Sequence, residues 1–163
     1  MPGFQDKHSL PFTPKQLYDM VLDIEKYPDF LPWCTRSEIV ERLDEEGKLY
    51  ASVSAGYALY SETYLSKVLF QDAKRIEATY IEGPFKNLHT LWLFNEHPKG
   101  CELLFSVDFE FETGLLNTVA KHMFTQVTEK MVEAFIQRAH ALYAPLLTLS
   151  KTDFKEVAPA FFS

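Results

Sequence analysis

Residues 101–112, CELLFSVDFEFE, decide the fold of this chain. Every second side chain from Leu103 to Phe111 is apolar, and the positions between them, apart from Leu104, are polar or acidic. A period of two predicts a β-strand with one buried face and one face toward water. The stretch therefore indicates a sheet that another element covers on one side.

A long helix is predicted directly after this strand, from Thr113-Gly114 to about Tyr143, with Pro145 marking its end. It spans about 30 residues and is therefore about 45 Å long. Its apolar residues recur at steps of three and four, the spacing of a helix that is buried on one side. They are Leu116, Val119, Ala120, Met123, Val127, Met131, Ala134, Phe135 and Leu142.

Upstream of residue 101 the chain reads as a series of strands separated by turn residues such as Gly47 and Gly83-Pro84. The predicted strands are residues 4–10 at an edge, 38–43, 48–57, 59–70, 75–82 and 87–95. We therefore predict an α+β, helix-grip fold, in which a curved antiparallel sheet of about six to seven strands grips one long C-terminal helix. Such a fold tends to leave a cavity between helix and sheet, where a ligand binds.

A shorter helix is predicted near the N-terminus, because several helix-start signals coincide there. Thr13 is a typical N-cap, Pro14 suits the first helical position, and Gln16 completes a capping box. Phe12 and Leu17 have the spacing of a hydrophobic staple. The helix is expected to run to about Ile24 and to bury Leu17, Met20, Val21 and Ile24.

The segment from Tyr27 to Cys34 contains Pro28 and Pro32 and is rich in apolar side chains. Each proline disfavours helix in the residue before it, so at most one short helical turn fits between them. The segment is therefore predicted to be a bent, packed connection.

The composition limits the partners of the protein. The chain has 163 residues, a net charge of -7 and 15% aromatic residues. Binding to duplex DNA needs clustered basic residues, and Lys74-Arg75 is the nearest approach to such a cluster. DNA is therefore not expected as a partner, whereas the aromatic residues suit a core or an apolar pocket.

The cysteines and the N-terminus indicate a reducing compartment. Cys34 and Cys101 form no CxxC pair and are expected to be reduced, buried thiols; a disulfide would require the fold to bring them together. The first residues lack the pattern of a signal peptide, and no apolar run reaches about 18 residues. We expect a soluble, cytoplasmic protein, with a peripheral contact at the inner membrane left open.

Four stretches of the chain resemble the coenzyme Q-binding protein family, including its bacterial branch of ribosome-association toxins, within the START-like (polyketide cyclase-like) superfamily. The stretches are residues 23–34, residues 83–88 with Trp92 and Phe94, residues 108–111, and residues 131–139. The resemblance covers about residues 3–144 in matching order. It implies a single START-like domain over residues 1–144, followed by a tail over residues 145–163.

The resemblance implies two functions of different classes. One is the binding or chaperoning of a ubiquinone-like polyprenyl lipid in a hydrophobic cavity, which supports respiratory electron transport. The other is inhibition of ribosome association by binding a ribosomal subunit. The acidic net charge weighs against broad contact with ribosomal RNA, so the sequence favours the lipid function.

No catalytic residue and no metal site is predicted. The chain contains no nucleophile elbow, P-loop or Rossmann fingerprint, and the five histidines lack metal-ligand spacing. We therefore expect a protein that is not an enzyme and needs no cofactor, with a ubiquinone-like lipid as its bound ligand.

The candidate ligand-binding residues are mainly aromatic and aliphatic side chains that can either line a pocket or fill a dry core. They are Phe30, Leu31, Trp33, Phe85, Lys86, Leu88, Trp92, Phe105, Phe109, Phe124, Val127, Met131 and Phe135.

Two charged residues carry specific expectations. Lys86 follows the Gly83-Pro84 turn, where its ammonium could donate a hydrogen bond to a quinone carbonyl, or else point into water. Arg138 lies within the apolar stripe of the long helix, so a structural role is expected. Its guanidinium should pair with a carboxylate or a backbone carbonyl, or extend to solvent at the edge of the stripe.

Overall fold

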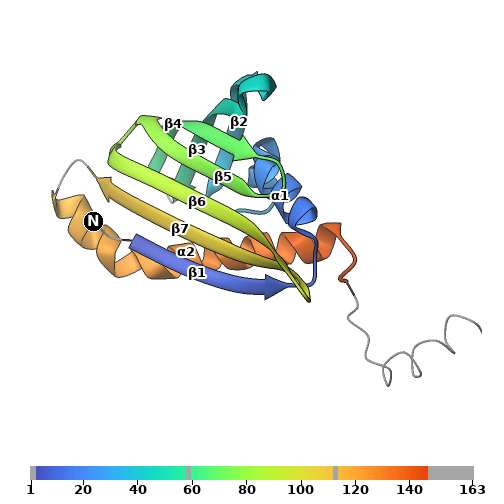
Figure 1. The fold of residues 1–163 in the computed structure, drawn as a ribbon. Helices are drawn as coiled ribbons and strands as arrows, with labels where there is room; N and C mark the ends of the chain where they lie inside the picture. The colour runs from blue at the N-terminus through green and yellow to red at the C-terminus, as the bar shows by residue number, and fades with distance from the viewer. Residues whose placement is uncertain (1–2, 58–59, 112–113, 147–163) are drawn as a thin grey trace, which may run out of the picture.

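The computed structural model describes the backbone of residues 3–57, 60–111 and 114–146, and the side chains of residues 3–56, 62–110 and 126–146. Within these ranges the elements follow one another in chain order (Figure 1). They are β1 (Gly3–Leu10), α1 (Pro14–Leu22), the 3₁₀ helix η1 (Ile24–Asp29), β2 (Cys34–Leu43), the 3₁₀ helix η2 (Asp44–Glu46), β3 (Lys48–Tyr57), β4 (Tyr60–Gln71), β5 (Arg75–Glu82), β6 (Phe85–His97), β7 (Gly100–Phe111) and α2 (Gly114–Leu142).

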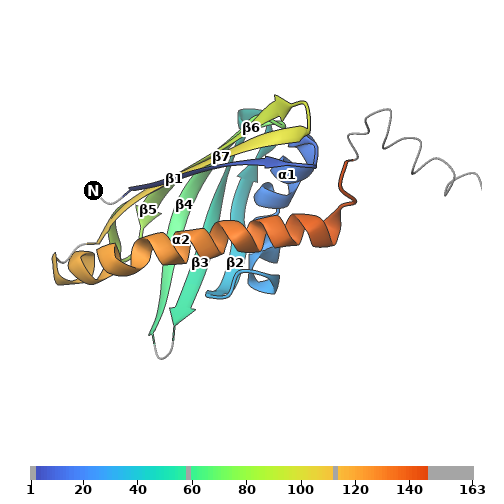
Figure 2. The ribbon, with the colours of Figure 1, turned by 90° about the horizontal axis from the view of Figure 1, so that it is seen from below.

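The strands form one antiparallel sheet of seven strands in the order β1-β7-β6-β5-β4-β3-β2. From β2 to β7 each strand pairs with the next in sequence, whereas β1 pairs with β7, with Phe4 opposite Val107. The α2 helix runs along one face of this sheet, and α1 packs beside it (Figures 1 and 2). The predicted helix-grip fold is confirmed.

The face of the sheet toward α2, here called the inner face, follows the alternation predicted for residues 101–112. Leu103, Phe105, Val107 and Phe109 are all buried, and the residues between them are half-buried. The register carries the same face to the next strands, because Trp92 lies opposite Phe105 and also opposite Ile76 of β5. The β5–β6 and β6–β7 pairings join strands that are consecutive in sequence. The alternation along β7 therefore also determines which residues of β5 and β6 lie on the inner face.

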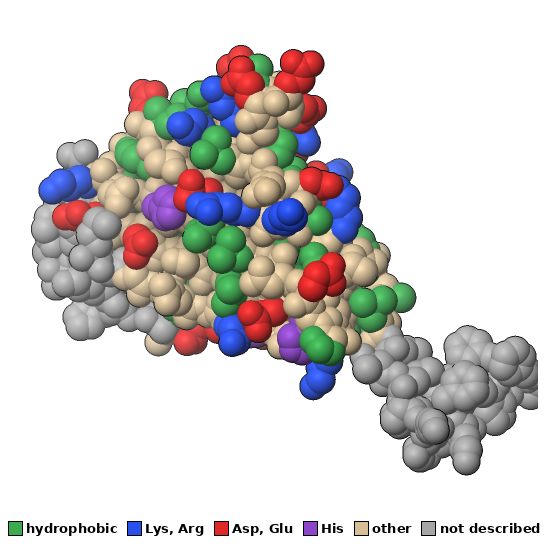
Figure 3. Space-filling model, viewed as in Figure 1, with side chains coloured by type: hydrophobic (Ala, Val, Ile, Leu, Met, Phe, Trp, Pro, Cys, Tyr) green, Lys and Arg blue, Asp and Glu red, His purple; other side chains and the backbone are tan. Residues whose placement is uncertain are grey.

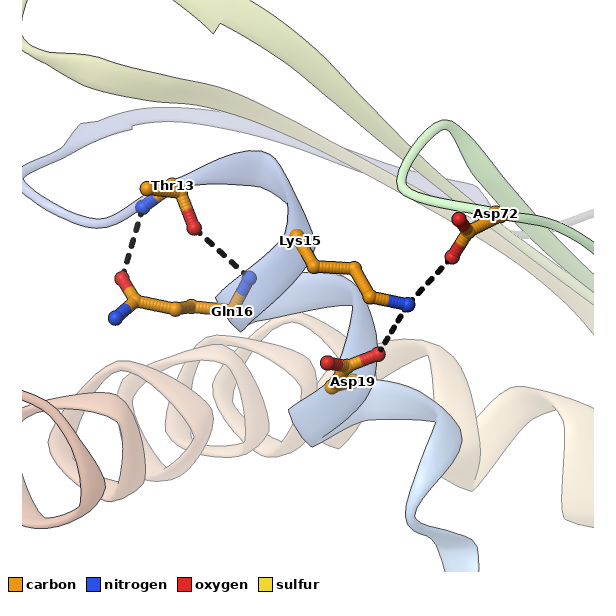
Figure 4. Close-up of polar contacts among 5 residues, drawn as sticks. All are labelled: Thr13, Lys15, Gln16, Asp19 and Asp72. Carbon is orange, nitrogen blue, oxygen red and sulfur yellow. Dashed lines mark hydrogen bonds and ion pairs between the residues drawn. The ribbon is translucent and has the colours of Figure 1, made fainter.

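The predicted start of α1 is confirmed in detail. The Gln16 backbone N–H donates to Thr13 Oγ1 at 3.1 Å, and the Thr13 N–H donates to Gln16 Oε1 at 3.0 Å, which completes the capping box (Figure 4). Leu17, Met20 and Val21 are buried as predicted. The helix ends at Leu22, before the predicted Ile24, which is buried in η1 instead.

Lys15 joins α1 to the turn between β4 and β5. Its ammonium lies 2.6 Å from Asp72 Oδ1 and 3.1 Å from Asp19 Oδ1 (Figure 4). All three side chains are exposed by half or more, so solvent screens the pairs and they contribute little to stability.

The connection after α1 is bent and packed, as predicted. It consists of η1, which contains Pro28, followed by an irregular segment in which Leu31 and Cys34 are buried. Tyr27 and Phe30 pack against the core. Cys34 already pairs with Ala55, so β2 begins four residues before the predicted Glu38, and β6 likewise begins at Phe85 instead of Asn87.

The buried stripe of α2 differs from the predicted one. Thr128, Val132, Phe135 and Ala139 are buried, whereas Val127 is 37% exposed and Leu142 is 46% exposed. The buried positions are spaced by four, three and four residues, so they follow one helical line that the sheet covers. The prediction is confirmed at Phe135, and the predicted Met131 and Ala134 are half-buried against the core, whereas Val127 and Leu142 were wrongly predicted to be buried. The predicted positions Leu116, Val119, Ala120 and Met123 lie outside the described side chains.

The two cysteines are free and buried, as expected. Among the described residues, no helix has both the length and the apolar composition needed to cross a membrane. The Leu146 N–H donates to Pro11 O at 2.6 Å, and residues 147–163 lie outside the described part of the chain. The boundary at residue 144 stays a prediction.

Candidate functional site: the inner face of the sheet

One group of aromatic rings, here called the Trp92 cluster, fills the space between the sheet and α2. The ring centroids of Trp92 and Phe105 are 4.4 Å apart, and those of Trp92 and Phe135 are 4.9 Å apart. Phe30 and Tyr27 reach the same Phe135 ring at 5.1 and 5.3 Å. Because Trp92, Phe105 and Phe135 are at most 5% exposed, these three predicted pocket residues form packed core.

A second group of rings, here called the Phe85 cluster, consists of Tyr64, Tyr80, Phe85 and Phe109. Phe85 lies at its centre, with ring centroids 5.7 Å from Tyr64, 5.8 Å from Tyr80 and 6.4 Å from Phe109. All three contacts are close to perpendicular, which is a favourable geometry for aromatic pairs. Among the described residues, this cluster is separate from the main core of the protein.

Coverage of the inner face decreases from the Trp92 cluster toward the Phe85 cluster. On β5 the inner-facing Ile76 is buried, whereas Ala78 and Tyr80 on the same face are half-buried. On β4 Val68 is buried and Tyr64 is half-buried. Accessible apolar surface therefore remains on the inner face, which is the property that an apolar ligand requires.

The phenols near this surface are strongly desolvated. Burial raises the pKa of Tyr64 to about 12 and raises the pKa of Tyr27 further still. The Tyr27 hydroxyl donates a hydrogen bond to Val21 O. Burial also raises the pKa of the Cys34 thiol, which donates to Arg36 O at 3.7 Å. All three groups are neutral near pH 7 and suit neutral ligands.

The remaining predicted pocket residues occupy varied positions. Leu31 is buried, Leu88 and Met131 are half-buried against the core, and half-buried Trp33 accepts a hydrogen bond on its carbonyl from Gly56 N–H at 2.8 Å. Val127 lies off the buried stripe, and the side chain of Phe124 lies outside the described residues.

The structure gives Lys86 an outward position. Its ammonium lies 3.8 Å from Glu110 Oε1, and its side chain is 67% exposed. Glu110 follows the inner-facing Phe109, so alternation places it on the opposite face of the sheet. Lys86 therefore takes the alternative in which the ammonium faces water, away from the inner face.

The predicted carboxylate or carbonyl partner of Arg138 is absent among the described residues. The guanidinium lies over the Phe30 ring instead, 5.2 Å from its centroid, and Nε is buried without a hydrogen-bond partner there. A cation over an aromatic face is a favourable contact. Through its contact with Phe30, Arg138 thus packs α2 against the segment that follows η1.

Tyr64 and Tyr80 were not predicted as site residues. The alternation of Tyr64, Ser66 and Val68 along β4 is a signal that could have placed Tyr64 on the inner face. The signal is weak, because the opposite face of the same strand carries Leu65 and Leu69.

Two hollows lined by described residues lie elsewhere. One, of about 320 Å³, lies between α1 and two turns and is lined by Lys15, Tyr18 and Asp72 among others. The other, of about 630 Å³, is lined mainly by β1, β6 and β7, including Lys7, Leu93 and Leu104. Neither lies between α2 and the Phe85 cluster, so the cavity expected under α2 stays a prediction. Within the described ranges no group of three or more His, Cys, Asp or Glu is placed to hold a metal.

Known proteins resemble the chain over most of its length. Residues 10–136 match the family model described as polyketide cyclase / dehydrase and lipid transport. A ribosome association toxin RatA from Rickettsia prowazekii is 34% identical over 141 residues, which cover 85% of this chain and 97% of that protein. The mitochondrial coenzyme Q-binding protein COQ10 homolog B from Xenopus laevis is 31% identical over 145 residues, 86% of this chain and 59% of that protein.

The fold is also known from solved structures. A START superfamily protein from Mycobacterium smegmatis matches with a TM-score of 0.75 at 15% identity, over 86% of this chain and 99% of that one. At this identity the match shows the fold alone. The family match shows more: the chain belongs to the polyketide cyclase / dehydrase and lipid transport family, and it is similar to RatA and COQ10 proteins over most of its length.

Proposed function

We propose that this protein acts on ribosome association, as a toxin-type interaction protein that binds a ribosomal subunit. The observation that carries the proposal is the match to the Rickettsia RatA protein, which spans 97% of that relative. The whole relative therefore corresponds to this one domain. This reverses the order favoured by the sequence, in which the lipid function came first.

The charge distribution on the surface favours a small, specific interface with the ribosomal subunit. Lys and Arg side chains are interspersed with Asp and Glu over the sheet face that points away from α2 (Figure 3). With a net charge of -7, broad attraction to RNA phosphates is unfavourable. Binding would depend on a specific patch and on complementary shape.

Purified bacterial 30S and 50S subunits test this function. Adding the protein before the subunits are mixed should reduce the 70S peak in a sucrose gradient, and the protein should sediment with one subunit. Serum albumin, another acidic protein, serves as the control. An unchanged 70S peak with no co-sedimentation would contradict the proposal.

The second candidate function is the binding of an apolar ligand, such as a ubiquinone-like polyprenyl lipid, on the inner face. The specific support is the Phe85 cluster, in which the rings of Tyr64, Tyr80 and Phe85 are half-buried. The Xenopus relative is named as a coenzyme Q-binding protein. Burial contributes about 0.8 kcal/mol per CH₂ group, so a few isoprene units suffice for micromolar affinity.

Native mass spectrometry with lipid extraction tests the second candidate. A bound mass that extraction identifies as a quinone or another lipid supports it, and protein that binds no lipid from vesicles contradicts it. In both functions we propose that the protein performs no catalysis and needs no cofactor. We place it in the cytoplasm, with a peripheral contact at the inner membrane where lipid would exchange.

A further inference from the structure

One edge of the sheet is formed by β1. Among the described strands, β1 pairs with β7 alone, so its other side has no neighbouring strand (Figure 1). A strand in this position presents a row of backbone N–H and C=O groups to any extended chain that reaches it. The free edge of β1 is therefore a surface on which a further strand can pair.

Two hydrogen bonds show which residues of β1 point to this edge. The Lys7 N–H donates to Asp6 Oδ1 at 2.9 Å, and Pro11 O accepts from Leu146 N–H at 2.6 Å. Both backbone groups thus point away from β7. Alternate residues of an antiparallel strand direct their backbone groups to the same side. The odd-numbered residues of β1 therefore direct their N–H and C=O groups to the free edge.

The C-terminal segment of the chain begins at this same edge. The last turn of α2 lies near the end of β1 (Figures 1 and 2), and Leu146 then bonds to Pro11. This bond has the form of a first antiparallel pair, in which Pro11 accepts but cannot donate, because it lacks an N–H. If the pairing continues, residues 148, 150 and 152 come opposite residues 9, 7 and 5.

The sequence of the segment suits a strand in this register. Leu147 and Leu149 alternate with Thr148, Ser150 and Thr152, which is the period of a strand with one apolar side. Threonine is also a residue type that strands favour. The apolar positions would lie on the same side of the sheet as the even-numbered residues of β1.

The residues that come opposite one another are complementary. Leu147 comes opposite the buried Leu10, and Lys151 comes opposite Asp6. Opposite charges at such cross-strand positions are favourable. The Asp6 carboxylate already lies at the edge, since its Oδ1 accepts from Lys7 N–H. In the paired state this N–H would donate to the carbonyl of residue 150, and Asp6 Oδ1 would be free to meet the Lys151 ammonium.

A second copy of β1 is a poorer occupant of the edge. Antiparallel pairing of two β1 strands that keeps both faces of the sheet places Asp6 opposite Asp6, or Lys7 opposite Lys7, in the registers of greatest overlap. Like charges directly opposite one another destabilise a strand pair. The C-terminal segment avoids this repulsion, and it is joined to the edge at Leu146, which gives it a high effective concentration there.

We propose that residues 147–152 pair antiparallel with β1 as a further strand, with Thr148 opposite Ser9 and Ser150 opposite Lys7, and so close this edge of the sheet to other chains. The proposal rests on neither of the candidate functions. It identifies the β1 edge as an interaction surface and a segment of the same chain as its occupant. An extended peptide of another protein would have to displace this segment before it could pair with β1.

NMR spectroscopy of the full chain tests the pairing directly. In an antiparallel pair, the Hα atoms of two opposite residues that share no hydrogen bond lie close together. Nuclear Overhauser contacts are therefore expected between the Hα atoms of Leu147 and Leu10, and between those of Leu149 and His8. These contacts should not depend on protein concentration, because the pairing lies within one chain.

Proline substitution tests the backbone bonds. Ser150→Pro removes an N–H that the pairing uses, so the amide of Lys7 should exchange about 10-fold faster than in the wild type. The amide of His8 points to β7 and should be unchanged, which makes it an internal control. Val157→Pro is the matched control variant, because residue 157 lies beyond the paired stretch, and it should leave Lys7 exchange unchanged.

Charge reversal tests the register. Lys151→Glu places a like charge opposite Asp6 and should speed the exchange of the Lys7 amide by about 2- to 5-fold. Lys155→Glu makes the same change four residues further on, beyond the end of β1 in this register. It should leave the exchange of Lys7 as it is in the wild type.

Any of three results overturns the proposal. The first is the absence of the Hα contacts, or their presence in another register. The second is equal exchange of the Lys7 amide in the wild type and Ser150→Pro. The third is contacts that strengthen with protein concentration, because a second copy would then occupy the edge. None of these results bears on ribosome or lipid binding, so the candidate functions are tested separately.

Discussion

At the residue scale, the two cysteines show how burial raises the pKa of a thiol. Cys101 is fully buried, and burial raises its pKa from 9.0 to about 11, whereas Cys34 is slightly accessible. The folded-state pKa of Cys101 lies above the unfolded value. Its contribution to stability is therefore complete below pH 9.0 and is lost as the pH rises toward 11.

Replacing this thiol should flatten the alkaline loss of stability. We expect the free energy of unfolding of Cys101→Ala to fall less between pH 8 and pH 11 than that of the wild type, although the variant is less stable at pH 8 because it lacks a buried sulfur atom. Urea denaturation at both pH values measures this. Parallel losses in the two proteins would show that other groups govern the alkaline range.

Gly100 occupies a position where the backbone conformation and the available space both require glycine. Its φ is +138°, and a Cβ there would lie 2.6 Å from Leu10 O and 2.7 Å from Phe12 O, which are backbone atoms that cannot move aside. Gly100→Ala should lower the free energy of unfolding by about 2 kcal/mol or more. In Gly3→Ala the new Cβ meets the movable Asp108 carboxylate, so this control should lose much less. Urea unfolding curves compare the two, and equal losses would refute the argument.

At the element scale, the start of α1 is fixed by side-chain caps and the position of α2 by packing. Thr13 and Gln16 satisfy backbone donors of the helix within a few residues of each other. The described part of α2 is positioned by packing against the sheet, and Thr128, a polar residue, lies on its buried line.

Removal of the cap should therefore be measurable. Thr13→Ala should cost about 1 kcal/mol of unfolding free energy, because the Gln16 backbone N–H loses its acceptor, Thr13 Oγ1. Lys15→Ala is the control on the same helix turn, and its exposed ion pairs should contribute nothing measurable. Thermal and urea unfolding measure the loss of stability in both variants. A larger loss in Lys15→Ala than in Thr13→Ala would contradict the prediction that the cap contributes more than the ion pairs.

Arg138 connects α2 to the η1 connection through an aromatic contact. Arg138→Met keeps an unbranched apolar side chain beside Phe30 and should cost about 1 kcal/mol or less. Arg138→Ala removes the packing as well and should cost more. A loss of about 3 kcal/mol or more in the Met variant would reveal a buried ion pair and refute this assignment.

At the scale of the whole molecule, one end of the inner face is filled and the other is in part open. The Trp92 cluster and α1 fill the first end, and the Phe85 cluster lies at the second. A ligand that binds between α2 and the sheet should stabilise the second end most, since apolar surface remains accessible there.

Hydrogen exchange can locate this effect. Saturating decylubiquinone should slow amide exchange in residues 62–66 and 85–90 by several-fold and leave α1 nearly unchanged. Mass spectrometry of peptides from both regions measures the change. Uniform slowing across the protein, or slowing confined to the hollow beside Leu93 and Leu104, would place the ligand elsewhere.

Local signals in the chain were enough to predict the order of the strands and of the two α-helices. The alternation from Leu103 to Phe109, the cap at Thr13 and the turn at Gly83 are local signals, and local backbone preferences respond to them directly. The family resemblance extended this to the fold and to the two candidate functions. Lys86 and Arg138 were the uncertain cases, because the partner of a long charged side chain depends on which neighbour the fold supplies.

Which apolar residues are packed and which are accessible depends on tertiary contacts that no single segment encodes. The sequence placed Trp92 and Phe85 in the same candidate pocket, but Trp92 lies in the packed core and Phe85 is half-buried. The fold also brings Tyr27, Cys34 and Tyr64 together from η1, β2 and β4. The physical reason is that such contacts depend on strand register and on how α2 rests on a curved sheet, and neither of these is encoded in a short stretch of chain.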